Sequence, residues 1–262
     1  MWGERRGSSA IFLLISFAAS AGNASASAWG RNSGDVLIIT KSAYFSAPME
    51  RVDGRDDRFR RLDGETYIEV GVAPRVTVGG KVVYGASWTD TDGAASGFSE
   101  IQAFSQYRFI HTEKSAAAFR FAGVRPSQFT GGVRPSLQSD GFDVEGAVLY
   151  GRTLRSAKPK LFLATEAGFR KRLSDSADQV RSQITIGVEP NRRFLFLLDA
   201  RAETSLRNAE NLGADYDVVK INPSVVWRIK PRWRVQFGFE EEFAGRNLAL
   251  GRTFSVGLWS EF

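Results

Sequence analysis

The chain consists largely of short stretches in which apolar and polar residues alternate, and no long helical period interrupts them. Alternation with a period of two is the pattern of a half-buried β-strand, so the predicted fold class is all-β. Twelve stretches of about 10–13 residues can be recognised on this criterion. They start near Asp35, Gly64, Val76, Phe98, Ala116, Gly141, Lys160, Gln179, Arg193, Tyr216, Arg232 and Leu250.

The gaps between these stretches alternate between short and long. Four of the five short gaps carry a proline close to a basic residue, as in Pro74-Arg75 and Pro231-Arg232. Short turns at one end and longer loops at the other are typical of outer-membrane barrels, whose short turns face the periplasm. We therefore predict a closed antiparallel up-and-down transmembrane β-barrel of about 12 strands, with both termini on the periplasmic side.

Alternation alone does not distinguish such a barrel from a soluble β-sandwich, whose apolar face points inward. The placement of the aromatic residues favours the barrel, because they gather beside both kinds of gap, as expected where a barrel wall meets two membrane interfaces. The predicted belt beside the short gaps contains Tyr107, Phe109, Tyr150, Trp227, Trp233 and Phe262, and the belt beside the long gaps contains Phe45, Trp88, Phe98, Phe142, Tyr216 and Phe243.

The first 28 residues are typical of a signal peptide. Arg5 and Arg6 provide a charged start, residues 10–19 ("AIFLLISFAA") an apolar stretch, and residues 26–28 ("ASA") a small-residue cleavage site. The apolar stretch is shorter than the roughly 20 residues that a membrane-spanning helix requires. We expect residues 1–28 to be removed and residues 29–262 to form the barrel.

Composition narrows the chemistry further. The chain has no cysteine and a single histidine, His111, which excludes disulfides and Cys-based metal sites and weakens any metal or Ser-His proposal. His111 is expected in a solvated periplasmic turn, away from the outer leaflet. We predict no enzymatic activity, no catalytic residues, no metal and no cofactor. The sequence pI is about 9.7, but an exported protein meets little nucleic acid, so anionic lipopolysaccharide or acidic polysaccharide is the expected opposite charge.

If the apolar face meets lipid, the polar face lines the lumen, and it carries both signs of charge. One interpretation is a network of ion pairs that fills a narrow barrel, since buried charges must be paired. The other is a solute path, because rings of Arg and Lys favour anionic solutes. The candidate lumen-lining residues are Lys81, Arg120, Arg170, Arg201, Lys220 and Arg234.

The stretch "MERVDGRDDRFRRLDG" (49–64) is rich in Arg and Asp and lacks the spacing of a calcium-binding loop. We expect it to be a solvated external loop. The alternative is contact of its arginines with lipopolysaccharide phosphates.

The C-terminal stretch "TFSVGLWSEF" resembles the assembly signal of bacterial outer-membrane proteins, which the barrel-insertion machinery recognises. Phe254, Val256, Leu258 and Phe262 match that signal, whereas Ser260 departs from it and Trp259 is out of phase. The resemblance implies location in the outer membrane of a Gram-negative bacterium, with outer-membrane lipid, lipopolysaccharide and the insertion machinery as partners. We also expect this last strand to pair with the strand near Asp35 and so close the barrel.

Residues 28–40 ("AWGRNSGDVLIIT") and 67–81 ("YIEVGVAPRVTVGGK") resemble the small barrels of Xag-type exopolysaccharide loci. This resemblance implies a role in the secretion or surface display of an exopolysaccharide, which would then be a further partner. Two alternatives stay open, a narrow porin for small anionic solutes or acidic oligosaccharides and a structural barrel with a plugged lumen.

Overall fold

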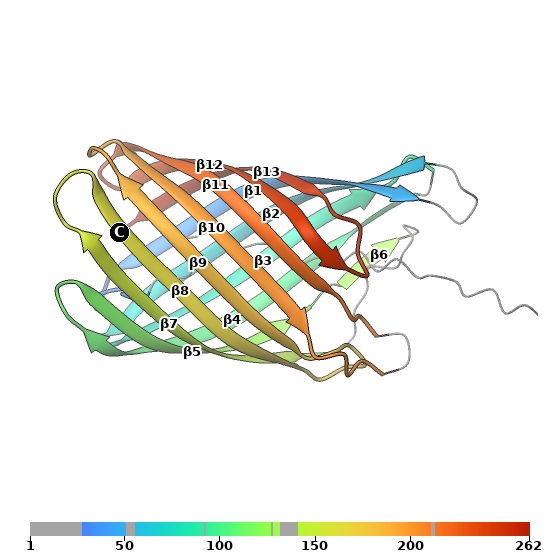
Figure 1. Cartoon of the computed structure of the whole chain (residues 1–262), viewed down its shortest axis with the longest axis horizontal. Coiled ribbons are helices and arrows are strands. Elements are labelled where there is room, and N and C mark those ends of the chain that lie inside the picture. Colours follow the sequence, from blue (N-terminus) through green and yellow to red (C-terminus); the bar gives the residue numbers. More distant parts are fainter. Residues whose placement is uncertain (1–27, 51–55, 92, 127, 132–140, 211–212) are drawn as a thin grey trace, which may run out of the picture.

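The computed structural model describes residues 28–50, 56–91, 93–126, 128–131, 141–210 and 213–262. All regular secondary structure in these residues is β, and the strands run antiparallel around a barrel (Figure 1). The strands are β1 (Val36–Glu50), β2 (Asp56–Ala73), β3 (Val76–Trp88), β4 (Ala94–His111), β5 (Ser115–Arg125), β6 (Gln128–Gly131), β7 (Asp143–Arg155), β8 (Lys160–Arg172), β9 (Gln179–Glu189), β10 (Phe194–Ser205), β11 (Asp217–Lys230), β12 (Trp233–Arg246) and β13 (Arg252–Glu261).

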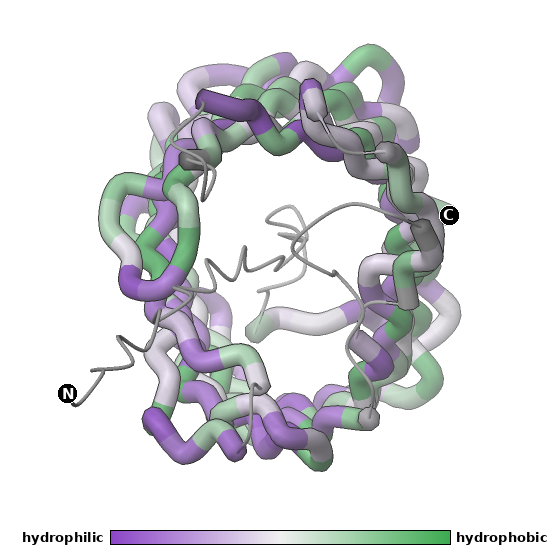
Figure 2. Tube along the Cα trace, turned by 90° about the vertical axis from the view of Figure 1, so that its right-hand side faces the viewer, coloured by the Kyte–Doolittle hydropathy of each residue, from purple (hydrophilic) through white to green (hydrophobic). Residues whose placement is uncertain are grey.

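The barrel is closed by its first and last strands. Consecutive strands pair with one another, except that β6 pairs with β4 and β5 pairs with β7; β1 pairs with β13 from Leu37↔Glu261 to Ser46↔Arg252. Val36 and Phe262 exchange both of their backbone hydrogen bonds, at 3.0 and 2.9 Å. No edge strand remains at this seam, which confirms the predicted closure and is visible in the view along the axis (Figure 2).

Twelve strand positions form the wall, because β5 and β6 share one of them. Arg125 at the end of β5 pairs with Ile101 of β4, and Gln128 at the start of β6 pairs with Phe98 of the same strand. The interruption includes Pro126, which has no N–H to give to the ladder. The predicted closed antiparallel barrel of twelve strands is thus confirmed.

Ten of the twelve predicted strands begin within two residues of the position expected from the sequence. The two exceptions are β2, which starts at Asp56 instead of near Gly64, and β4, which starts at Ala94 instead of near Phe98. The prediction that residues 49–64 form one loop was therefore wrong for residues 49–50, which end β1, and for residues 56–64, which belong to β2; residues 51–55 lie outside the described residues. Arg and Asp alternate on both faces of this extension, so it has no apolar side, and backbone pairing with β1 and β3 defines it instead.

Outside the polar extension of β2, the outward face of the strands is predominantly apolar. Such a surface is far larger than the apolar patches of soluble proteins, so the barrel is built to contact lipid. Its most exposed members include Phe121, Phe119, Phe254, Phe243, Tyr84, Val256 and Ile184.

The belt predicted beside the short turns is confirmed, because all six of its aromatic side chains are exposed. The belt beside the long loops is confirmed for Phe98, Phe142 and Phe243. It was wrong for Phe45 and Tyr216, whose side chains are buried in the interior. Phe45 packs against Phe59 in the interior, and Tyr216 donates a hydrogen bond to Glu203.

Candidate functional site in the barrel interior

Strand alternation turns the polar face inward, and it carries all six predicted lumen-lining cations. Each of them is paired with a carboxylate on another strand, which matches the interpretation of the polar face as an ion-pair network. The pairs are Lys81–Glu100 (2.5 Å), Arg120–Glu166 (3.1 Å), Arg170–Glu145 (2.8 Å), Arg201–Glu240, Lys220–Glu242 (2.9 Å) and Arg234–Glu261 (2.5 Å).

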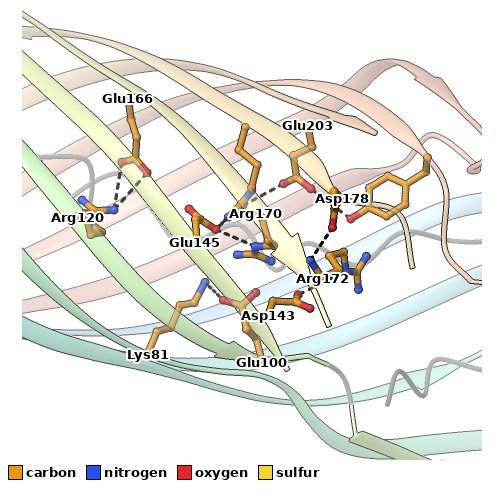
Figure 3. A network of polar contacts seen from close by, with 12 residues as sticks. Lys81, Glu100, Arg120, Asp143, Glu145, Glu166, Arg170, Arg172, Asp178 and Glu203 are labelled. Carbon is orange, nitrogen blue, oxygen red and sulfur yellow. Dashed lines mark hydrogen bonds and ion pairs between the residues drawn. The ribbon is translucent and has the colours of Figure 1, made fainter. Parts of the chain in front are cut away.

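The densest part of this network lies in the half of the barrel nearest the long loops (Figure 3). Glu145 on β7 accepts hydrogen bonds from Arg170 Nε at 2.8 Å and from Arg181 Nη1 at 2.9 Å. Arg181 also donates to Glu203 at 3.2 Å, and Glu203 accepts the hydroxyl of Tyr216 at 3.3 Å. Because these groups come from four neighbouring strands and the start of a fifth, the network ties the wall together from inside.

Arg120 contacts both a carboxylate, Glu166, and an aromatic ring, that of Phe104. Its Nη1 donates to Glu166 at 3.1 Å and its Nη2 to Gln106 at 3.3 Å. The guanidinium carbon lies 5.3 Å from the ring centroid of Phe104, within the range of a cation–π contact.

In more than half of the interior ion pairs the cation is more exposed than the carboxylate. The side chains of Arg181 and Arg31 are 27% and 21% exposed, against 6% for Glu145 and 3% for Glu69. The same order holds for Lys41–Glu65, Arg170–Glu145, Arg172–Asp143, Arg201–Glu240 and Arg228–Glu189. It is reversed for Arg61–Asp63, Lys81–Glu100, Arg120–Glu166, Arg31–Glu261 and Arg234–Glu261, and the two side chains of Lys220–Glu242 are equally buried. Solvent therefore reaches the cation more than the carboxylate around Arg181 and in the Arg31–Glu69 pair.

The half of the interior nearest the short turns is lined by what we call the apolar girdle. The rings of Tyr67 and Phe104 stack with centroids 5.9 Å apart, and Trp259 Nε1 donates to Gln236 at 3.1 Å. The girdle consists of Leu37, Ile39, Tyr67, Phe104, Phe162, Leu195, Leu197, Val226 and Trp259.

Glycines on the strands beside the girdle provide space for its rings. A Cβ added to Gly79 would lie 2.4 Å from the ring of Phe104, and one added to Gly187 would lie 2.1 Å from the ring of Phe162. A side chain at either glycine would require the ring to move.

Residues 28–32, which we call the N-terminal segment, lie inside the barrel at the end with the short turns. Ala28 is fully buried against alanines and Leu149 of β5 and β7. Trp29 meets Phe162 edge-on at a centroid distance of 6.4 Å, and Arg108 Nη1 donates to the carbonyl of Trp29. In the view along the axis, a stretch of chain projects from the wall into the interior (Figure 2).

Arg31 fixes the other end of the N-terminal segment. Its backbone N–H donates to Thr77 Oγ1 at 2.9 Å and its Nε donates to Glu69 at 2.7 Å, while its Nη1 lies 3.6 Å from Glu261. Gly30 has a φ of +59°, a left-handed conformation that favours glycine.

At the end with the long loops, Asp178 organises the connection between β8 and β9. Its carboxylate accepts hydrogen bonds from Lys171 Nζ (2.8 Å), the backbone N–H of Arg172 (2.9 Å) and Asn208 Nδ2 (2.9 Å). Burial opposes ionisation, but these three donors together hold the pKa of Asp178 below its usual value.

The four residues matched to the assembly signal lie where the alternation places them. Phe254, Val256, Leu258 and Phe262 all point outward and are exposed, and the out-of-phase Trp259 points into the apolar girdle. Their recognition by insertion machinery stays a prediction, because the fold places the side chains without identifying a partner.

Neither a catalytic nor a metal centre emerges from the described residues. His111 is exposed at the end of β4, beside the turn to β5. No group of three or more His, Cys, Asp or Glu residues in the described ranges is arranged to hold a metal ion. No helix in the part of the chain that the structure describes is long and apolar enough to cross a membrane.

Sequence reasoning missed the N-terminal segment, since nothing in residues 28–32 marks them as interior. It also missed the glycines that receive the girdle and the segment. A usable signal existed, because Gly71, Gly79, Gly151 and Gly187 all fall on the inward-facing register of their strands.

No protein-family model and no curated protein matches this sequence. Solved structures with a similar fold include the COG4313 outer membrane channel from Pseudomonas putida F1 (TM-score 0.67, 10% identity, 93% of this chain and 100% of that chain). They also include the NanC porin (0.57, 8%, 84% and 98%) and the translocator domain of the autotransporter NalP from Neisseria meningitidis (0.52, 11%, 89% and 91%). At these identities the likeness concerns architecture, and the chain therefore has the fold of outer-membrane β-barrels.

Proposed function

We propose that this protein is a narrow outer-membrane channel for small anionic solutes. The observation that carries the proposal is the order of exposure in the interior ion pairs that Arg181 and Arg31 form with Glu145 and Glu69. Carboxylates such as Glu145 and Glu69 are buried, and the guanidinium groups of Arg181 and Arg31 reach the solvent. A diffusing anion would therefore meet cations first, which is the arrangement expected in an anion-favouring pore.

The charge around the short turns supports the same direction of selectivity. Two exposed carboxylates, Asp35 and Glu113, accompany a much larger set of exposed cations. Such an excess raises the local concentration of anions at the mouth of a channel. The cations are Arg75, Lys114, Arg155, Lys158, Lys160, Arg192, Arg193, Lys230 and Arg232.

The setting of the channel is part of the proposal. The apolar wall and its two aromatic belts suit a bilayer, and the fold suits the outer membrane of a Gram-negative bacterium. The outward lipid contacts, the contact with lipopolysaccharide on the long-loop side and delivery by the barrel-insertion machinery through Phe262 belong to the same hypothesis.

Planar-bilayer recording of the refolded mature chain tests this function. In a KCl gradient we expect discrete channels whose reversal potential lies on the chloride side of zero. Replacing Arg181 by Gln should move the reversal potential toward zero, because Arg181 is the most exposed cation of the densest network. A folded barrel, identified by its heat-modifiable mobility in gels, that conducts no ions would overturn the channel; a cation-selective one would overturn its selectivity.

Export of an exopolysaccharide is a second candidate. The two segments that resemble barrels of exopolysaccharide loci, 28–40 and 67–81, fold against one another, as shown by the bond from Gly34 N to Gly71 O (2.8 Å) and by Arg31–Glu69. Together they would form the mouth through which a polysaccharide leaves the periplasm. Deletion of the gene should then reduce cell-surface polysaccharide, and unchanged export in the deletion strain would leave the small-solute channel alone.

A further inference from the structure

We propose that residues 29–32 of the N-terminal segment, which remain after the expected removal of residues 1–28, form the constriction of the channel, with Trp29 limiting solute size and Arg31 setting the preference for anions. The inference rests on the proposed channel function and assigns the residues that determine its specificity.

The wall of the barrel leaves space for the N-terminal segment at two glycine positions. A Cβ added to Gly71 would lie 1.8 Å from the carbonyl oxygen of Asn32, and one added to Gly151 would lie 2.3 Å from the indole of Trp29. Two strand positions therefore lack side chains at the points where the segment touches the wall. Glycine in a strand often marks a site where another stretch of backbone approaches closely, so these two positions indicate that the wall is shaped to receive the segment.

The contacts of the N-terminal segment extend over much of the circumference. Those of residues 29–32 involve β13 through Glu261, β2 through Glu69, β3 through Thr77, β4 through Arg108, β7 through Gly151 and β8 through Phe162. These strands lie on the side of the barrel opposite β9–β12. The space left for a solute at this level is thus bordered by the segment on one side and by β9–β12 on the other.

The groups that the segment presents are an indole and a guanidinium. Arg31 is held by Glu69 and lies within 3.6 Å of Glu261, yet its side chain remains 21% exposed. Glu69 is only 3% exposed, because Tyr67 also donates to it at 2.5 Å. A solute passing the segment would therefore meet the cation of the Arg31–Glu69 pair. It would also meet Glu261, which is 29% exposed and is shared between Arg31 and Arg234, so two cations accompany one exposed carboxylate at this level.

The first test compares the mature chain starting at Trp29 with a shortened chain starting at Gly34. Both are refolded and recorded in planar bilayers of the same lipid. We expect the shortened chain to conduct several-fold more current and to show a weaker chloride preference. Its heat-modifiable mobility should be retained, because β1 begins only at Val36.

A point substitution displaces the segment without deleting it. In Gly71→Ala the new methyl group overlaps the carbonyl oxygen of Asn32. The segment must therefore move away from β2, and conductance should rise. Gly64→Ala in the same strand is the matched control, since its Cβ has no neighbour closer than 3.8 Å and should leave conductance unchanged.

Cysteine modification locates the constriction directly, because the natural chain has no cysteine. Modification of an Arg31→Cys variant with a bulky thiol reagent should block most of the current, whereas the same reagent on Ser33→Cys, at an exposed position just outside the segment, should change it little.

The outcomes separate this inference from the channel function. Equal conductance of the two chain lengths, with wild type conducting, would overturn the constriction and leave the channel standing. A wild-type chain that conducts no ions while the shortened chain conducts would overturn the inference, because the segment would then close the lumen instead of selecting among solutes. Folded barrels of both lengths that never conduct would overturn the channel function and, with it, the inference.

Discussion

Near the short turns the interior is lined by aromatic rings that lie on glycines, whereas near the long loops it is lined by ion pairs that connect neighbouring strands. In the first region, contacts depend on shape, as with Phe162 over Gly187. In the second they depend on charge, as with Glu145 between Arg170 and Arg181. A closely fitted apolar layer is sensitive to added volume, while an ion-pair network is sensitive to the loss of one partner. The two halves should therefore respond to different substitutions.

The largest effect is expected in the ion-pair half. Glu145→Gln removes the shared carboxylate of two arginines and leaves their charges without this partner, which should cost about 3 kcal/mol of unfolding free energy. Urea unfolding in micelles, followed by tryptophan fluorescence, measures it. Glu241→Gln is the control, because Glu241 and Arg252 form a pair with side chains 43% and 65% exposed, and its loss should cost less than about 0.5 kcal/mol. Equal effects of the two substitutions would contradict the distinction between the halves.

The matching experiment in the apolar half adds volume. Gly187→Ala should cost about 2 kcal/mol, because the new methyl group overlaps the ring of Phe162. In a Phe162→Ala background the same substitution should cost much less, since the ring is absent. A double-mutant cycle in urea provides the coupling energy. Additive effects would show that the ring does not rest on Gly187.

A smaller effect is expected from the hydrogen bond that Trp259 of the apolar girdle donates to Gln236. Trp259→Phe keeps most of the ring but removes the N–H that donates to Gln236, leaving a buried acceptor unsatisfied at a cost of about 1 kcal/mol. Trp227→Phe, on the exposed outer face, serves as the comparison. If the outer substitution proves the more destabilising, the interior hydrogen bond is not important for the girdle.

The smallest effect concerns the loop network beyond the strands. The pKa of Asp178 is lowered in the folded state, so its ionised form stabilises the fold above the unfolded pKa of about 3.9. This contribution is lost as pH falls through the lower, folded pKa. Asp178→Asn should cost roughly 1 kcal/mol at pH 7 and progressively less below about pH 4. Unfolding curves at pH 7 and pH 3 for both proteins test the sign, and a difference that grew on acidification would refute it.

Most of the strand boundaries could be predicted because a lipid-facing wall imposes alternation wherever it crosses the membrane. The prediction failed where that constraint ends. Residues 56–63 of β2 carry polar side chains on both faces, as in Arg60 and Arg61, so only pairing with the adjacent strands reveals them as a strand. Phe45 was misplaced for a related reason, since an aromatic residue near a long loop suits either face.

The sequence allowed the prediction that the interior charges are paired, but not which arginine pairs with which carboxylate. The sequence places Arg120 and Glu166 on inward positions, but they are 46 residues apart in the chain and meet because β5 and β8 both border β7. Which arginine meets which carboxylate depends on register and strand tilt, and these follow from closure of the whole barrel.

The sequence by itself determined the class of the fold, the outward and inward faces, the closure by the last strand and the inward position of the six cations, because each follows from a period of two along one strand. The tertiary structure alone decided that Glu145 and Glu69 are buried beneath more exposed arginines and that residues 28–32 lie inside the barrel. Both depend on distances between strands that are remote in the chain. For the N-terminal segment, the deciding contacts are made with seven strands of the wall, and no local pattern in five residues can specify them.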